Sequence, residues 1–390
     1  MIYSIVFYCP DVHLEADKNT IDSIGIGGGI TARLRVAHAL AQIGHNVSLY
    51  VNSSKEKVID GVQYKHFSSI EKVDTDVFIA ASSGGAIDLK SIGSLNVKAE
   101  LKLLMVHSAD LPWNVNPGDF DFIYILSNFV RNMAEKHWPV DPRKFFVVYH
   151  GVADENFPIK KMIRDPYSMV YFSHPSKGLD SAIWIFRKLK EMDQRYSLHI
   201  YGGNQLWGGE DVPIVEEEGL YYHGMLGQVE LAKNLQGMEF SLNLQAREEP
   251  FGMVITESMR AGCIVIASQV GAFTELIHNG YNGFLVSGDH NEEKTIDHAV
   301  SLISTLNNNA GFCNFIRRNA IHTPLSWRVI AKTWEEHWDW FFDPSSIKGE
   351  IKIGKFPHCS SCTGELLLLS DGMHCISCGS YFRSFDGLVQ

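Results

Sequence analysis

Short apolar runs that alternate with helix-like segments constrain the fold of this chain more than any other feature. The first series has six mainly apolar runs that look apolar on both faces, as buried parallel strands are. They lie at residues 2–9, 47–51, 77–81, 101–107, 122–126 and 145–149. A second series follows at residues 169–173, 197–203, 240–245, 263–268 and 283–286. Strands that alternate with helices predict an α/β fold with parallel sheets.

The length of 390 residues predicts more than one hydrophobic core. Segment 151–166 is polar, carries two prolines and separates the two series of runs. It therefore suits a linker between two doubly wound domains, residues 1–152 and 153–325. A final helix at residues 326–345 carries an apolar stripe that we expect to pack back on the core; its members are Trp327, Ile330, Trp334, Trp338 and Phe341.

Composition and charge exclude several classes of protein. A net charge of -11 argues against a nucleic-acid-binding protein, because phosphate contacts require a basic surface. No apolar stretch approaches the roughly 18 residues of a membrane helix, and the N-terminal MIYSIVFYCP has neither a basic flank nor a cleavage signature. We therefore expect a soluble, unexported chain in the cytoplasm.

A glycine-rich segment, GIGGGI at residues 25–30, lies between a predicted strand and a predicted helix. In the helix Ile30, Leu34 and Ala37 recur at helical spacing, and Gly44 follows as a stop signal. Free N–H groups at such a helix start favour a phosphate. However, Ile30 replaces the third glycine of a dinucleotide fingerprint, and no acid follows the second strand. Alone, the glycines fit a phosphate loop and a tight structural turn equally well.

The stretch EEPFGMVITE, residues 248–257, places Glu249 and Glu257 on either side of an apolar, helix-like run. If a helix begins near Phe251, a diphosphate could rest on its first N–H groups while the two carboxylates accept hydrogen bonds from sugar hydroxyls. A carboxylate pair at this spacing is by itself more typical of a charged surface. The surrounding motifs are therefore needed to choose between the two interpretations.

The whole run 248–286 resembles the donor-binding half of GT-B glycosyltransferases of the family 4 type, with their E-x7-E motif. Other segments resemble this family in the family's own order, over roughly residues 1–342; they are GIGGGI at 25–30, VVYHGV at 147–152, SKGLD at 176–180, LHIYGG at 198–203 and YHGML at 222–226. The resemblance implies a GT-B fold of two Rossmann-like domains with a cleft between them. The first domain would lie on the acceptor side and the second would bind a nucleotide sugar.

The resemblance also implies roles for individual residues. Glu257 would hold the ribose of the donor, Glu249 would contact the transferred sugar, and Lys177 would neutralise the diphosphate. The full set of expected donor-binding residues is Gly27, Gly28, Gly29, Ser173, His174, Lys177, Gly202, Gly203, Glu249, Phe251, Gly252, Met253, Val254 and Glu257. The implied reaction is metal-independent transfer of a sugar with retention of anomeric configuration, to a glycan, lipid or small-molecule acceptor.

His107 ends a predicted buried strand at the edge where open α/β sheets bind ligands. By resemblance it would be an active-site histidine, and Asp110 is a second candidate. One departure concerns the diphosphate, because related enzymes usually carry an arginine about five residues before the lysine. Here Ser173 and His174 would supply weaker donors, or Arg247 would turn in to replace the missing arginine.

Three other functions remain open from the sequence. A nucleotide-sugar epimerase of GT-B fold would bind a similar donor, and a hydrolase could use paired carboxylates. A non-enzymatic sugar-binding or zinc-scaffold protein is the third. The acceptor is not indicated, and segment 128–138 is either an amphipathic helix or a weak membrane-facing surface.

Four of the seven cysteines lie near the C-terminus with the spacing C-x2-C, twelve residues, C-x2-C. Such clustered cysteines in a reducing compartment bind zinc more often than they form disulfides. Cys359, Cys362, Cys375 and Cys378 would complete a tetrahedral shell, and the segment between the pairs is expected to form a short β-hairpin. The sequence therefore predicts a structural zinc ribbon at residues 354–390, outside the catalytic site.

Overall fold

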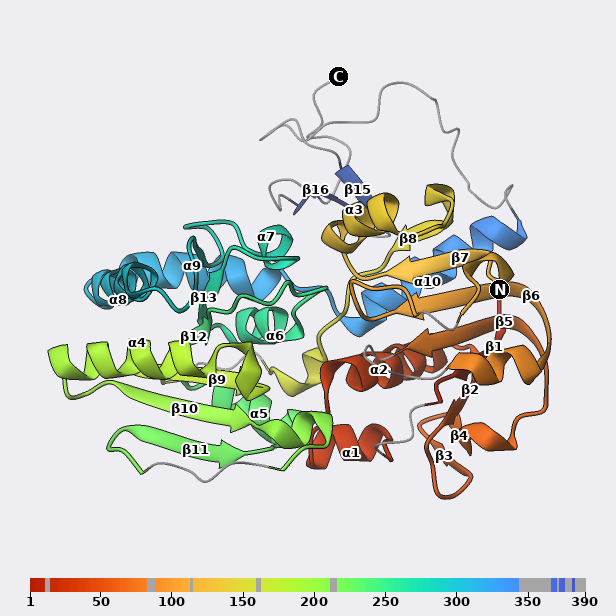
Figure 1. Ribbon diagram of the computed structural model, residues 1–390, viewed down its shortest axis with the longest axis horizontal. Coiled ribbons are helices and arrows are strands. Elements are labelled where there is room, and N and C mark those ends of the chain that lie inside the picture. The colour runs from red at the N-terminus through yellow and green to blue at the C-terminus, as the bar shows by residue number, and fades with distance from the viewer. Residues whose placement is uncertain are drawn as a thin grey trace.

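The computed structural model describes residues 1–10, 15–82, 89–112, 115–158, 163–210 and 216–343, together with the backbone of three short strands within residues 366–382. Two sheets lie side by side along the longest axis (Figure 1). One is built from the first half of the chain and the other from the second half, so the predicted division into two series of strands is confirmed.

The first sheet has eight strands in the order β3-β4-β2-β1-β5-β6-β7-β8. All neighbours are parallel except β3 and β4. All six predicted strands are present, and β3 and β4 were missed because they are a short hairpin at the sheet edge. The strands are β1 (Ser4–Tyr8), β2 (Asn46–Val51), β3 (Lys57–Ile59), β4 (Val62–His66), β5 (Lys72–Ser82), β6 (Asn96–Val106), β7 (Phe122–Ile125) and β8 (Phe145–Val147).

The helices of this half are α1 (Lys18–Ser23), α2 (Gly28–Gln42) and α3 (Asn128–His137). Helix α2 ends just before Gly44, which adopts a φ of 111°, so the predicted stop is confirmed. Helix α3 buries Val130 and Ala134, as an amphipathic helix does.

The last helix, α10 (Trp327–Phe342), packs against α2 of the first half. Its side chains Trp334 and Trp338 are fully buried in the core of the first half. These members of the aromatic stripe therefore pack in the hydrophobic core of the first half.

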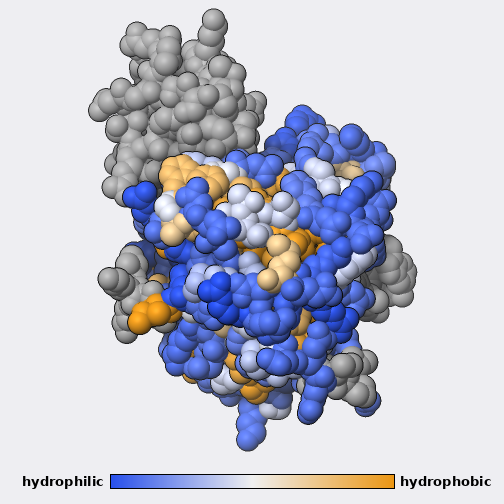
Figure 2. Space-filling model, turned by 90° about the vertical axis from the view of Figure 1, so that its left-hand side faces the viewer, coloured by the Kyte–Doolittle hydropathy of each residue, from blue (hydrophilic) through white to orange (hydrophobic). Residues whose placement is uncertain are grey.

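The second sheet has six parallel strands in the order β11-β10-β9-β12-β13-β14. Five were predicted, and the edge strand β11 was missed. The strands are β9 (Asp165–Ser173), β10 (Ser197–Gly202), β11 (Leu220–Gly224), β12 (Met238–Asn243), β13 (Ile264–Ser268) and β14 (Phe284–Val286). The helices are α4 (Leu179–Met192), α5 (Gln228–Leu235), α6 (Met253–Ala261), α7 (Phe273–Leu276), α8 (Glu293–Asn307) and α9 (Ala310–His322). The outer end of this half is largely hydrophilic, with small apolar areas (Figure 2).

The chain passes between the two halves twice, and the two passages lie side by side. The N–H of Val152 donates to the carbonyl oxygen of Leu325 at 2.8 Å. A Cβ on Gly151 would lie only 2.5 Å from the backbone nitrogen of Trp327, so a glycine is required for this close approach. The polar segment after residue 151 is therefore the first of two adjoining connections.

Near the C-terminus, β15 (Leu366–Leu369) pairs antiparallel with β16 (Gly372–Cys375), which pairs with β17 (Tyr381–Phe382). The predicted hairpin between the cysteine pairs is thus confirmed. Of the proposed zinc ligands, Cys359, Cys362 and Cys378 lie outside the described residues, and only the backbone of Cys375 is described. Among the side chains that are described, no group of three or more His, Cys, Asp or Glu could hold a metal ion.

Candidate donor site between the two sheets

Loops at the carboxyl ends of the strands of both sheets meet in the middle of the molecule, where open α/β sheets bind ligands (Figure 1). The start of α2 touches the start of α6: a Cβ on Gly28 would lie 3.4 Å from the sulfur of Met253. A Cβ on Gly27 would lie 3.0 Å from the carbonyl oxygen of Leu206. Gly27 and Gly28 therefore bring the backbone of the first half against the second half, and Gly29 follows them as the second residue of α2.

Lys177 and Glu249, 72 residues apart, form an ion pair at this meeting point. The Lys177 Nζ lies 2.8 Å from each carboxylate oxygen of Glu249, and both side chains are largely buried. Gly178 makes the arrangement feasible, because its φ is 94° and a Cβ would lie 1.8 Å from the carbonyl oxygen of Leu244. The amide of Gln245 donates a further bond of 3.3 Å to Glu249.

The loop that carries Glu249 is held from both halves of the molecule. The N–H of Ala272 donates to the Glu249 carbonyl oxygen at 2.9 Å, and the buried hydroxyl of Ser127 donates to the Pro250 carbonyl oxygen at 2.6 Å. Helix α6 begins at Met253, two residues later than the expected start near Phe251. Gly252 has a φ of 97°, which the helix cannot include, so Phe251 and Gly252 precede the helix and Met253 and Val254 open it. No described side chain caps this helix start.

Glu257 lies inside α6 and contacts another set of residues. Its carboxylate accepts a hydrogen bond of 2.8 Å from the amide of Gln228, the first residue of α5. Burial raises the pKa of the Glu257 carboxyl to about 7, and the charge of Arg35 on α2 opposes this shift. Glu257 is therefore poised to change its protonation state near neutral pH.

Trp207, which the sequence analysis did not single out, lies against three basic side chains of the site. Trp207 ends the short 3-10 helix η7 (Asn204–Trp207), and the ring of His174 stacks on it at 3.6 Å. The Lys177 Nζ lies 5.8 Å and the Arg247 guanidinium carbon 5.3 Å from the centre of its ring. Burial, together with the charges of Lys177 and Arg247, lowers the pKa of His174. Arg247 thus lies close enough to Lys177 to act as a second cation.

The remaining expected donor residues lie beside this cluster. Gly202 ends β10 and Gly203 follows it; their φ values are 90° and 129°, and they lead into η7. A Cβ on Gly202 would lie 2.8 Å from the carbonyl oxygen of Ser173, the last residue of β9. The two glycines therefore let the β9 and β10 loops approach each other next to Lys177.

His107 follows directly after β6 and is buried. Its ring lies 5.4 Å from that of His150, which in turn lies 4.9 Å from Phe251. Burial lowers the pKa of His150 to about 3, so its imidazole is neutral, and neither ring nitrogen has a hydrogen-bond partner among the described residues. The two histidines connect the first sheet to the E-x7-E segment, whereas Asp110 is exposed at the surface.

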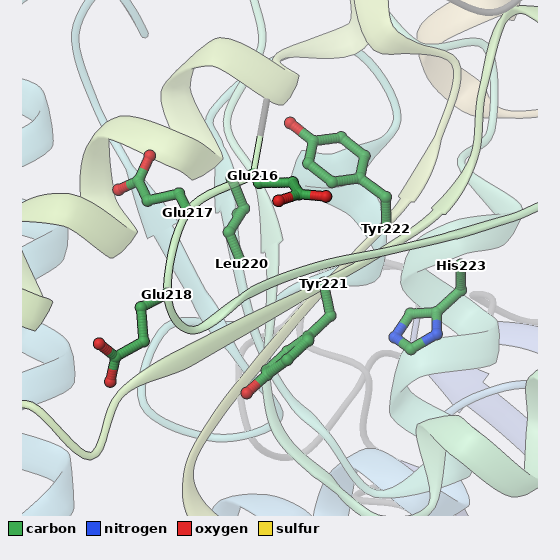
Figure 3. A pocket seen from close by; sticks show the side chains of 7 residues that line it. All are labelled: Glu216, Glu217, Glu218, Leu220, Tyr221, Tyr222 and His223. Atoms are coloured by element: carbon green, nitrogen blue, oxygen red, sulfur yellow. The ribbon is translucent and has the colours of Figure 1, made fainter. Parts of the chain in front are cut away.

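A surface cavity of about 450 Å³ lies away from these residues, at the edge strand β11 (Figure 3). Tyr221 and His223 project from one side of the strand and Tyr222 from the other. Its rim carries three consecutive carboxylates, at residues 216–218. Because like charges repel, this cavity does not suit an anionic diphosphate.

Residues 169–320 match the family model described as glycosyl transferases group 1. An uncharacterized glycosyltransferase of Methanocaldococcus jannaschii, MJ1178, is 27% identical over 176 residues, or 42% of this chain. That match spans 45% of the relative's own length. The family match covers the half that carries Lys177, Glu249 and Glu257, and it supports the prediction of a glycosyltransferase enzyme.

Solved structures resemble the chain over most of its length. Sucrose-phosphate synthase from Thermosynechococcus elongatus superposes with a TM-score of 0.66 at 14% identity, covering 88% of this chain and all of that one. A glycosyltransferase from Rickettsia africae gives 0.63 at 14% identity, with 88% and 100% coverage. Anabaena Alr3699/HepE in complex with UDP and glucose gives 0.60 at 14% identity, with 86% and 99% coverage. The fold is thus the two-domain, GT-B-like fold of these glycosyltransferases, as predicted.

Among the described helices, none combines the length and the apolar character that a membrane span requires.

Proposed function

We propose that this chain transfers a sugar from a nucleoside-diphosphate sugar to an acceptor, with retention of anomeric configuration. The observation that carries the proposal is the buried Lys177–Glu249 ion pair, placed where the starts of α2 and α6 meet. The match to group 1 glycosyltransferases over residues 169–320 supports the same function. The proposed acceptor-side domain comprises residues 1–152 and the proposed donor-side domain residues 153–325.

In this proposal the ion pair is the resting form of the donor site. An incoming diphosphate takes over the ammonium group of Lys177, and the freed Glu249 carboxylate then accepts hydrogen bonds from hydroxyls of the sugar. Gln245 is buried beside Glu249, and its carbonyl oxygen has no hydrogen-bond partner among the described residues, so it offers a further acceptor. Exchange of partners avoids leaving either buried charge unpaired.

The chemical step places negative charge on the leaving diphosphate. Lys177, the first N–H groups of α6 and the guanidinium of Arg247 are the groups that would stabilise it. The bond between the anomeric carbon and the phosphate oxygen breaks as the acceptor oxygen attacks from the same face. The acceptor's proton passes to the departing phosphate oxygen, so no protein base is required. His107 would line the acceptor side of the sugar.

We further propose that residues 354–390 bind one structural zinc ion through Cys359, Cys362, Cys375 and Cys378. The support is the spacing of the two C-x2-C pairs and the β15–β16 hairpin between them. Four thiolates close the shell, and the metal would stabilise a segment too short to build its own core. A reducing, cytoplasmic compartment agrees with this use of cysteine.

The proposal is tested by a thermal-shift screen of nucleotide sugars, followed by assays of donor hydrolysis and transfer. Uridine diphosphate sugars come first, because the structural neighbour Alr3699/HepE was solved with UDP-glucose. Lys177→Ala should lower turnover by at least a hundredfold without unfolding the protein. Lys188→Ala is the matched control, since Lys188 also forms ion pairs but lies on the outer helix α4. An unimpaired Lys177→Ala enzyme, or release of an epimer of the donor without any acceptor, would contradict the proposal.

A further inference from the structure

A chain of hydrogen bonds runs from the first half of the molecule to Glu257 in the second half. Arg35 on α2 donates to Asp22 on α1 at 2.5 Å and to the carbonyl oxygen of Gln228 at 2.7 Å and 3.0 Å. The amide nitrogen of Gln228 then donates to Glu257 at 2.8 Å. Arg35 is 4% exposed, so it holds this position away from bulk water.

The chemistry of Arg35 and Glu257 fixes which way the Gln228 amide points. A guanidinium has only donors, so it requires the carbonyl oxygen of Gln228, and the NH2 group is then directed at the Glu257 carboxylate. A carboxamide can accept a hydrogen bond from one partner and donate one to the other. The position of Arg35 in the first half therefore fixes, through Gln228, the hydrogen bond that the Glu257 carboxylate accepts in the second half.

The backbone around Gln228 is packed against the first half too closely for side chains. A Cβ on Gly227 would lie 2.1 Å from the carbonyl oxygen of Asp22, and a Cβ on Gly25 would lie 2.3 Å from that of Leu226. Helices α1 and α5 lie side by side at this seam (Figure 1). The hydrogen-bond chain is thus formed only while the two halves are in contact.

We propose that Arg35 and Gln228 are positioning residues that couple contact between the two halves to donor binding, by orienting the Glu257 carboxylate for the ribose hydroxyls. The inference rests on the proposed function, because it assigns Glu257 to the donor. It adds that the first half contributes to binding the nucleotide without touching it. The ribose site is then complete only when the seam is formed.

The electrostatic surroundings of Glu257 agree with this role. Burial disfavours its charge, whereas the Gln228 donor and the charge of Arg35 both favour it. Several other charged side chains on the elements packed around Glu257 are paired, which are Lys233 with Glu230 on α5, Arg317 on α9 with Glu239, Arg260 on α6 with Asp154, and Glu275 on α7 with the start of α3. Glu155 lies 3.7 Å from Arg35, and Arg318 on α9 is exposed to solvent. Removing the Gln228 donor should therefore keep Glu257 protonated to a higher pH.

The test uses the full chain and isothermal titration calorimetry between pH 6 and 8.5, with whichever of UDP, GDP, ADP and CDP gives the largest thermal shift. Gln228→Glu keeps an acceptor for Arg35 but loses the donor to Glu257. It should weaken binding about tenfold at pH 7.5 and move the midpoint of the binding–pH profile up by about one unit, as loss of a charge-assisted bond predicts. Gln228→Leu and Arg35→Met should shift the midpoint in the same direction.

Gln194→Leu and Arg143→Met are matched controls, because both residues are exposed and distant from the seam, and their profiles should equal that of the wild type. The nucleotide also titrates in this pH range, but its contribution to the binding–pH profile is the same for every variant and cancels in the comparison with the wild type. If Glu257→Gln weakens binding but both Gln228 variants leave the midpoint unchanged, the coupling is refuted while the donor site stands. A uniform loss of affinity with no shift of the midpoint also refutes it. If Glu257→Gln has no effect, the assignment of the donor site fails as well.

Discussion

Glu257→Gln separates the proposed role of this carboxylate in donor binding from its cost to the stability of the fold. The substitution keeps the shape of the side chain and an oxygen that can accept from Gln228, but it removes the ionisation. In the wild type, burial raises the pKa of Glu257 from an ordinary value to about 7. The folded protein therefore binds this proton more tightly than the unfolded chain does, and the free energy of unfolding falls as the pH rises from 4.5 through 7.

The magnitude follows from the two pKa values. Between pH 5 and pH 8 the wild type should lose about 2 kcal/mol of unfolding free energy that Glu257→Gln keeps, with allowance for the partial exposure of the side chain. Donor binding should change in the opposite direction. If the ionised carboxylate accepts from the ribose hydroxyls, affinity in the wild type should rise about tenfold from pH 6 to pH 8 as the carboxyl ionises.

Both quantities can be measured on the same two proteins. Urea unfolding at pH 5 and pH 8 gives the stabilities, and calorimetric titration with the best nucleoside diphosphate gives the affinities. We expect Glu257→Gln to be the more stable protein at pH 8 and to bind the nucleotide more weakly, with a flatter profile than the wild type. Parallel pH dependence of both stability and affinity in the two proteins would refute the argument, because it would mean that Glu257 does not titrate in this range.

Three further predictions concern other contacts. Glu275→Gln should lower the free energy of unfolding by about 2 kcal/mol, because the Glu275 carboxylate on α7 accepts hydrogen bonds from the first two N–H groups of α3 in the other half. An unchanged free energy of unfolding, measured by calorimetry, would contradict this prediction. In the Lys177→Ala background, His174→Arg should restore part of the transfer activity by returning a cation to the same loop, and no gain in turnover would argue against this loop as the phosphate site. Metal analysis should find about one zinc ion per chain, and the double variant Cys359→Ser with Cys378→Ser should lose it. The truncated chain, residues 1–345, should still hydrolyse the donor. A native protein without metal would refute the zinc ribbon.

Much of the fold was predictable because its signals are local. The buried strands are continuous apolar runs, α2 is bounded by glycines, and Ser326 caps the last helix through its hydroxyl. Strands β3, β4 and β11 were missed since they lie at or next to sheet edges, where one side of a strand faces solvent and the apolar run is broken. The start of α6 was placed two residues early because Gly252 has a φ of 97° and lies where a Cβ would meet the ring of Phe273, and neither feature can be predicted from the local sequence.

The sequence by itself determined the class of fold and the order of its elements, since both depend on spacing along the chain, and its resemblance to a known family supplied the residues of the candidate donor site. It also placed Glu249 just before a helix and Glu257 inside the same helix. Only the tertiary structure decided which side chains meet. Lys177 reaches Glu249 across 72 residues, and Arg35 reaches Gln228 across 193 residues. Such contacts arise where two halves bury surface against each other, and no local propensity encodes them.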